Sequence, residues 1–165
     1  MAATKEKEKR VVDPYFAFAF VIEFSETPLV APSGKAVPLC SGAFSMCSGL
    51  EATMEPKVIK QGGQNYGANQ RVGPVTFATV VLKRGMTRAR DLWKWFDFVT
   101  NAGGYSHRLT VTIKMKDPAG NVVVTWKLQN ALPIKFKAAD LDARASDVAI
   151  EELHLAHEGL TLVPS

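Results

Sequence analysis

Alternating apolar and polar positions dominate this sequence and predict β-strands along most of its length. The clearest run covers residues 15–24, where every second side chain is a large apolar one. A change of parity between Ile150 and Leu153 predicts a β-bulge at Glu151 and Glu152. Similar runs predict further strands at residues 44–49, 51–60, 74–83, 107–116, 122–129, 134–137 and 147–157.

One segment, residues 88–101, instead repeats its apolar residues at steps of three and four and predicts a helix. Thr87 is the predicted N-cap of this helix. The predicted core stripe consists of Ala89, Leu92, Trp93, Phe96 and Val99. Trp95 and Phe98 fall outside this stripe. Because large exposed apolar groups mark interfaces, these two residues are candidate contacts with another subunit.

Two segments lack either periodicity. Residues 25–42 are rich in proline and glycine, which predicts a loop or a loose hairpin. Residues 61–73 are polar and glycine-rich, which predicts a long exposed loop. A loop of this length in a small domain is usually functional.

The predicted elements define a fold class. About seven or eight strands and one helix, without βαβ alternation, indicate a mainly β protein. We expect two antiparallel sheets packed as a small barrel or sandwich, with one flanking α-helix. In the 165-residue chain, residues 1–12 read as a charged tail and residues 13–165 as a single domain.

Composition narrows the classes of protein. Hydrophobic residues make up 47% and charged residues 22%, which excludes a wholly disordered chain. No apolar run approaches the roughly 20 residues of a membrane helix, and residues 1–10 do not resemble a secretory signal. The net charge of +4 is too small to indicate a nucleic-acid-binding protein. Cys40 and Cys47 are predicted to be reduced thiols.

No motif for catalysis, cofactor binding or metal binding stands out. The sequence contains no Gly-x-Ser-x-Gly elbow. His154 and His157 are three apart, so in a strand they would point to opposite faces. The acidic cluster Glu151, Glu152 and Glu158 is compatible with a hydrolase, but the polar face of an interface strand is the favoured interpretation. The residues therefore indicate a non-enzymatic, self-associating β-domain, with an enzyme or a small-ligand-binding β-barrel as the remote alternative.

The acidic cluster also carries a structural prediction. Ile150 and Leu155 are expected in the core, whereas Glu151, Glu152 and Glu158 are expected to face solvent, a channel or a neighbouring subunit. At least one of the three carboxylates should pair with a lysine or arginine. Arg84 is one available cation, so Arg84 and the three glutamates join the candidate interface residues.

Several short blocks, in their order and spacing, resemble the tail tube family of contractile phage tails. The similarity is greatest to the inner tube proteins of phage-tail-like contractile injection systems, and it covers residues 13–162. The main blocks are Asp13-Pro14-Tyr15, Ser48-Gly49-Leu50-Glu51, Leu82-Lys83-Arg84-Gly85, Trp126-x-x-x-Asn130-Ala131 and Ala156-His157-Glu158-Gly159-Leu160.

The resemblance implies a structural tube protein that forms homohexameric rings stacked into a hollow tube. It implies a surrounding contractile sheath, baseplate and spike proteins, tube-capping proteins and cargo in the lumen. Assembly would occur in the bacterial cytoplasm, without stable insertion into a membrane. In this family a homologous loop joins one ring to the next. The corresponding residues here are Gly62, Gly63, Gln64, Asn65, Tyr66, Gly67 and Asn69.

The resemblance leaves two roles open within the same machine. Residues 25–42 are longer than the short turn typical of the family, and the charged extension 1–12 is unusual. Both departures suit a tube-initiator ring or baseplate adaptor as the alternative to the main tube subunit.

Overall fold

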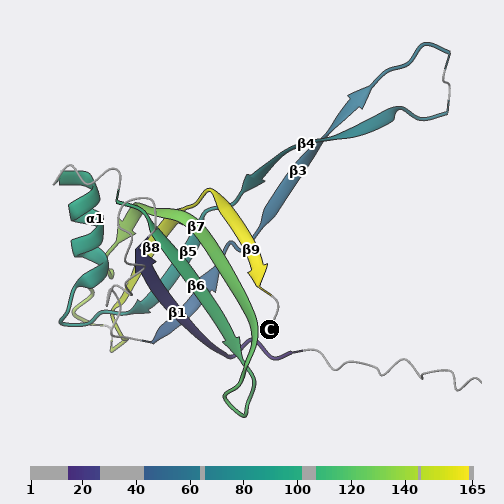
Figure 1. Cartoon of the computed structure of the whole chain (residues 1–165). Helices are drawn as coiled ribbons and strands as arrows, with labels where there is room; N and C mark the ends of the chain where they lie inside the picture. Colours follow the sequence, from purple (N-terminus) through teal and green to yellow (C-terminus); the bar gives the residue numbers. More distant parts are fainter. Residues whose placement is uncertain (1–14, 27–42, 64–65, 102–106, 145, 164–165) are drawn as a thin grey trace, which may run out of the picture.

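Strand β7 (Val122–Lys137) joins two antiparallel sheets in the computed structural model of this chain (Figure 1). The structure describes residues 15–26, 43–63, 66–101, 107–144 and 146–163. The other elements in this part of the chain are β1 (Ala19–Glu26), β2 (Phe44–Ser48), β3 (Ala52–Ile59), β4 (Asn69–Phe77), β5 (Val80–Gly85), α1 (Asp91–Asn101), β6 (Leu109–Lys116), β8 (Ile150–Ala156) and β9 (Gly159–Val163).

The two halves of β7 have different neighbours. The first half pairs with β6 and β9, and β6 pairs in turn with β1. The second half pairs with β8, followed by β5 and then β2. All of these pairings are antiparallel, so the predicted mainly β class with two antiparallel sheets and one helix is confirmed. The arrangement is sandwich-like, and the described strands do not close into a barrel.

The core lies between these sheets and beneath α1. It forms because strands β5, β6 and β8 alternate buried with half-buried positions, as the sequence pattern predicts. The largest fully buried aliphatic side chains are Val80, Leu82, Leu92, Leu109, Val111, Leu128, Leu153 and Leu155.

The first strand begins later than predicted. Residues 15–18 precede β1, and the side chains of Phe16 and Phe18 are 70% and 66% exposed. The reason is register, because the β1 ladder starts with Ala19 opposite Lys116, the last residue of β6. Ile22 lies further along β1 and is buried as expected.

Three other strand predictions need correction. Residues 69–73 are not loop but the start of β4, which pairs with β3. The predicted strand 74–83 is divided at residues 78–79 between β4 and β5. The two strands predicted on either side of Pro133 form a single strand, β7. Its pairing with β8 shifts register between Pro133 and Lys135, so the ladder accommodates a proline that has no N–H to donate.

The C-terminal strands also differ from the prediction. β8 runs opposite β5 without a register shift, so the predicted bulge at Glu151 and Glu152 is wrong. The buried positions of β8 are Glu151, Leu153 and Leu155, whereas Ile150 is only half-buried. β9, after His157 and Glu158, was not predicted.

The helix is present, and Leu92 and Val99 are buried as predicted, but the predicted placement of Trp93 inward and Trp95 outward is wrong. α1 begins at Asp91 rather than near residue 88, so Thr87 is not its N-cap. Its buried residues are Leu92, Trp95 and Val99. The ring of Trp95 meets the ring of Phe24 edge-on, with 5.8 Å between centroids. Trp93 and Trp95 lie on adjacent faces of the helix. The contact of Trp95 with Phe24 of β1 places the Trp95 face in the core.

Candidate assembly surface

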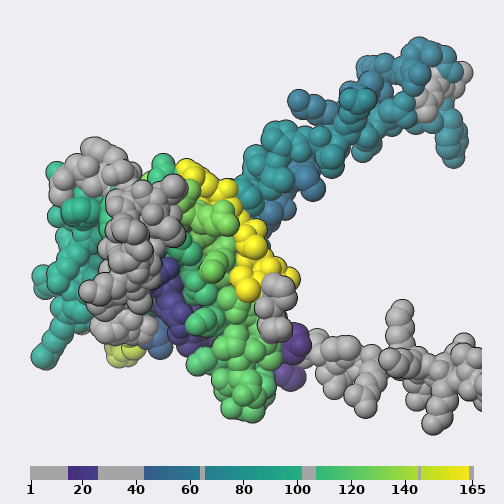
Figure 2. All heavy atoms as spheres, in the orientation of Figure 1, coloured from purple at the N-terminus to yellow at the C-terminus, as the bar shows by residue number. Residues whose placement is uncertain are grey.

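A two-stranded ribbon, β3 with β4, extends away from the body of the molecule (Figure 1). The space-filling view shows it standing clear of the two sheets (Figure 2). Every residue of β3 is exposed. Most positions of β4 are exposed as well. A ribbon with solvent on both sides has no buried face to impose alternation, which is why the sequence pattern missed the start of β4.

The predicted ring-stacking residues lie at or near the tip of this hairpin. Gly62, Gly63, Tyr66 and Gly67 connect the two strands, and Asn69 is the first residue of β4. Gln64 and Asn65 lie outside the described residues. The side chain of Tyr66 is 98% exposed. Gly63 and Gly67 have φ of +86° and +79°, conformations that favour glycine.

One face of the hairpin is apolar, which the sequence analysis did not identify. Met54 lies opposite Val75 and Pro56 opposite Val72, so these four side chains share a face with Val58. We call these five residues the hairpin stripe. Met54, Val58, Val72 and Val75 are 52%, 58%, 75% and 47% exposed. The alternation of Met54, Pro56 and Val58 was the available sequence signal for this surface.

Three of the candidate interface residues, Trp95, Arg84 and Glu151, are buried inside the subunit instead. Arg84 is fully buried and Glu151 is 3% exposed. The Arg84 Nε atom donates a hydrogen bond of 2.6 Å to Glu151 Oε1. The guanidinium also lies 5.9 Å from the ring centroid of Phe44. The expectation that Glu151 faces outward is therefore wrong, because its positive partner sits opposite it in the β5–β8 ladder.

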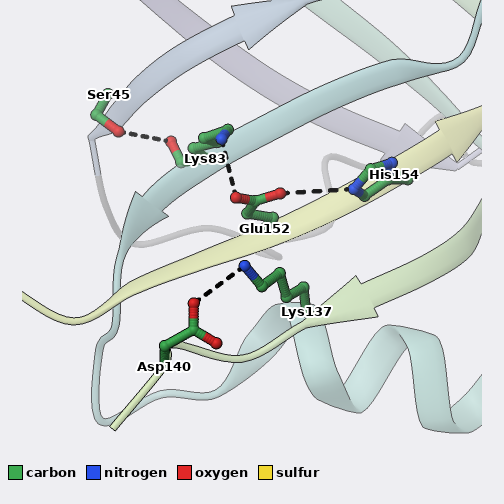
Figure 3. A network of polar contacts seen from close by, with 6 residues as sticks. All are labelled: Ser45, Lys83, Lys137, Asp140, Glu152 and His154. Atoms are coloured by element: carbon green, nitrogen blue, oxygen red, sulfur yellow. Dashed lines mark hydrogen bonds and ion pairs between the residues drawn. The ribbon is translucent and has the colours of Figure 1, made fainter. Parts of the chain in front are cut away.

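The next pair along the same ladder, Lys83 and Glu152, lies on the opposite face of the sheet and is half-buried; Figure 3 shows its contact together with that of His154. Lys83 Nζ donates a 2.8 Å hydrogen bond to Glu152 Oε1, and His154 Nε2 lies 3.6 Å from Glu152 Oε2. The hydrogen bond from Lys83 is the largest cause that holds the pKa of Glu152 below its ordinary 4.5. A carboxylate with a lowered folded-state pKa stabilises the protein above pH 4.5. That stabilisation is lost as the pH falls through the folded-state value.

Glu158 forms a third pair at the turn between β8 and β9. Its carboxylate accepts hydrogen bonds from Arg108 Nη1 and, at 2.7 Å, from Asn130 Nδ2. The Asn130 amide, followed by Arg108, lowers the pKa of Glu158. All three glutamates therefore meet a lysine or arginine within the subunit, and the predicted pairing is confirmed.

The two aromatic interface candidates on α1 behave differently. Trp95 is 3% exposed, so its assignment to an outer surface is wrong. Phe98 is 45% exposed and meets the ring of His107 edge-on, with 5.2 Å between centroids. Trp93, predicted for the core, is 46% exposed, and its ring meets the ring of Phe136 with 5.3 Å between centroids.

The described residues contain no cluster of three or more His, Cys, Asp or Glu side chains suited to a metal ion. No helix in the described part of the chain is long and apolar enough to span a bilayer.

Burial raises the pKa of the Cys47 thiol from its ordinary 9.0 to about 11. Because the thiolate is the reactive form, we expect Cys47 in a Cys40→Ser variant to react with iodoacetamide at pH 8 about 100-fold more slowly than the same variant unfolded in guanidinium chloride. The measurement is the alkylation rate by mass spectrometry. Equal rates in the folded and unfolded states would contradict the burial of this thiol.

The two-sheet body carries an exposed apolar ribbon, and an exposed apolar surface of this kind marks an interaction site. The sequence matches the T4-like virus tail tube protein gp19 family over residues 16–161, and the chain belongs to this family. It is therefore a tail tube protein, with a structural role, as the sequence resemblance predicted. None of the curated proteins compared matches the sequence.

Solved structures share the fold over almost the whole chain. A chain of the cryo-EM structure of the anti-feeding prophage (AFP) baseplate, 6-fold symmetrised, is 27% identical with a TM-score of 0.77, covering 93% of this chain and 98% of that one. A chain of the extended PVC sheath–tube complex, an extracellular contractile injection system, is 19% identical with a TM-score of 0.73, covering 99% and 100%. A chain of the AFP tube-terminating cap is 19% identical with a TM-score of 0.74, covering 100% of both chains.

Proposed function

We propose that six copies of this chain form a ring and that the rings stack into the inner tube of a contractile injection system. The tube carries cargo in its lumen, has no enzymatic activity of its own, and is assembled in the bacterial cytoplasm. A contractile sheath surrounds it, and a baseplate with a spike and a tube-capping protein contact its two ends. The family membership and the fold shared with AFP and PVC chains support this proposal.

The observation that carries the proposal is the hairpin stripe. Met54, Val58, Val72 and Val75 have large exposed areas on a ribbon that projects from the body. Such a surface is a liability in a monomer, because it invites non-specific association. Burial against another copy removes the liability. In this proposal the stripe packs against a different surface of the neighbouring copy, which makes the contact heterologous, as closed rings and stacked rings require.

A second candidate role is the tube-initiator ring that meets the baseplate. The observation in its favour is that this chain is 27% identical to a chain of the AFP baseplate structure but 19% identical to one of the PVC sheath–tube complex. An initiator would present one ring surface to the tube and the other to the baseplate.

Negative-stain electron microscopy of the purified full-length protein tests both roles. We expect hexameric rings at micromolar concentration. Long tubes formed by this chain alone identify the main tube subunit, whereas single or paired rings that nucleate tubes of a second tube protein identify the initiator. Monomers at all concentrations, measured by sedimentation, would contradict both roles.

A further inference from the structure

The hairpin is attached to the body through a small set of contacts at its base. The Ala78 N–H donates a 3.1 Å hydrogen bond to the Glu51 carbonyl oxygen, which closes the two strands. Gly49, with φ of +86°, lies so close to residue 79 that an added Cβ would be 2.1 Å from the Thr79 carbonyl oxygen. These backbone contacts hold the strands together. A side-chain contact at the base adds a further constraint on the ribbon.

One side-chain contact joins the base of the hairpin to a distant part of the body. The ring of Phe77, the last residue of β4, lies against the ring of His157, with 5.2 Å between centroids and 42° between planes. Both residues are half-buried. Opposite Phe77 in the ribbon is Ala52, whose small side chain gives Phe77 little support. Among the described residues, the ring of His157 is the aromatic neighbour of Phe77.

Hydrogen bonds hold His157 and the turn that carries it in place. Its Nδ1 donates a 3.1 Å hydrogen bond to the Gly159 carbonyl oxygen. The Glu158 N–H donates a 2.9 Å hydrogen bond to the Gln129 carbonyl oxygen. The Glu158 carboxylate also accepts hydrogen bonds from Arg108, which immediately precedes β6, and from Asn130 of β7. The turn that carries His157 is thus hydrogen-bonded both to β7 and to Arg108 beside β6.

We infer that His157 is a positioning residue that sets the direction in which the β3–β4 hairpin leaves the body. Its ring, fixed by the β8–β9 turn, holds Phe77 and with it the base of β4. The consequence for assembly rests on the proposed function, since a hairpin that samples many directions meets the neighbouring copy less often in the correct orientation. The positioning role itself does not depend on assembly.

Two variants separate the ring of His157 from its hydrogen bond. His157→Asn retains a side-chain N–H donor for Gly159 but removes the ring. His157→Phe retains a ring against Phe77 but removes the donor. Phe77→Leu removes the ring from the hairpin side and leaves the β8–β9 turn unchanged. Circular dichroism of each variant reports whether the subunit is folded.

Pulsed EPR measures the direction of the hairpin. Spin labels are attached at Gln70→Cys on β4 and Lys127→Cys on β7, in a background with Cys40→Ser and Cys47→Ala. Labelled chain is diluted with an excess of unlabelled chain, so that distances within one subunit are recorded. We expect a narrow distribution for the parent and for His157→Phe, and one about twofold broader for His157→Asn and Phe77→Leu.

Tube length by electron microscopy is the second readout, with loss in His157→Asn and retention in His157→Phe. A distribution for His157→Asn as narrow as that of the parent would overturn the inference. So would a distribution for His157→Phe as broad as that of His157→Asn. If the parent itself forms neither rings nor tubes, the proposed function fails, while the distance distributions still decide whether His157 positions the hairpin.

Discussion

The Arg84→Met variant is expected to lose about 3–5 kcal/mol of unfolding free energy. Arg84 is fully buried, and its Nε–H donates to Glu151 at 2.6 Å. Removing the guanidinium leaves a carboxylate that is 3% exposed without its positive partner. An unpaired charge in that position is costly because it has exchanged water for an apolar surrounding. Urea denaturation of dilute, unassembled subunits measures the change.

The neighbouring residue supplies a matched control. Lys83 lies on the same strand, forms the adjacent ion pair and points to the other face of the sheet. Because the Lys83 and Glu152 side chains are 33% and 19% exposed, solvent screens their attraction. The Lys83→Met variant should therefore lose only about 0–1 kcal/mol.

A double variant distinguishes the lost pair from lost packing. Arg84→Met combined with Glu151→Leu removes both charges and fills their space with apolar atoms. Such replacements are often neutral or stabilising, so this variant should regain most of the stability lost in Arg84→Met. If Arg84→Met costs no more than Lys83→Met, the pairing of Arg84 with Glu151 does not offset the burial of the Glu151 carboxylate.

Shortening the hairpin is expected to abolish tubes while leaving the subunit folded. Lys57 and Arg71 lie directly opposite each other, so an Asn-Gly turn that replaces residues 58–70 between them preserves the register. The described residues of this segment, 58–63 and 66–70, are exposed and contribute little to the core. Shorter loops also close at little entropic cost. We expect a nearly unchanged thermal midpoint, together with the loss of tubes by sedimentation and electron microscopy.

A full-length pair of variants tests which face of the hairpin matters. Val58→Thr with Val72→Thr makes the hairpin stripe polar, and we expect it to reduce tube formation strongly. Lys57→Thr with Arg71→Thr changes the same number of residues on the opposite face and should retain tubes at physiological salt. Tubes of normal length from the shortened hairpin, or equal effects of the two paired variants, would contradict a contact made by the stripe.

The sequence by itself determined the elements whose patterning has a single solution. β6 was predictable because Leu109, Val111 and Ile113 alternate with polar residues, and a half-buried strand accepts that pattern on one face only. The residues 117–121, Asp-Pro-Ala-Gly-Asn, are typical of a tight turn by composition alone, and Gly120 supplies the φ of +89° that closes it. The mainly β class and the tail tube family followed from such local signals.

The tertiary structure decided features for which the sequence allowed two solutions. Trp93 and Trp95 both have helical spacing with apolar neighbours, and only packing against Phe24 places Trp95 in the core. Glu151 reads as a surface charge until β5 brings Arg84 opposite it, because the cost of burial depends on a partner 67 residues away. The start of β4 was missed for the related reason that a solvated ribbon needs no alternation. The cross-strand pairs of the apolar stripe and the contact of the hairpin with His157 emerge only from the register of β3 with β4 and the fold around the base of the hairpin.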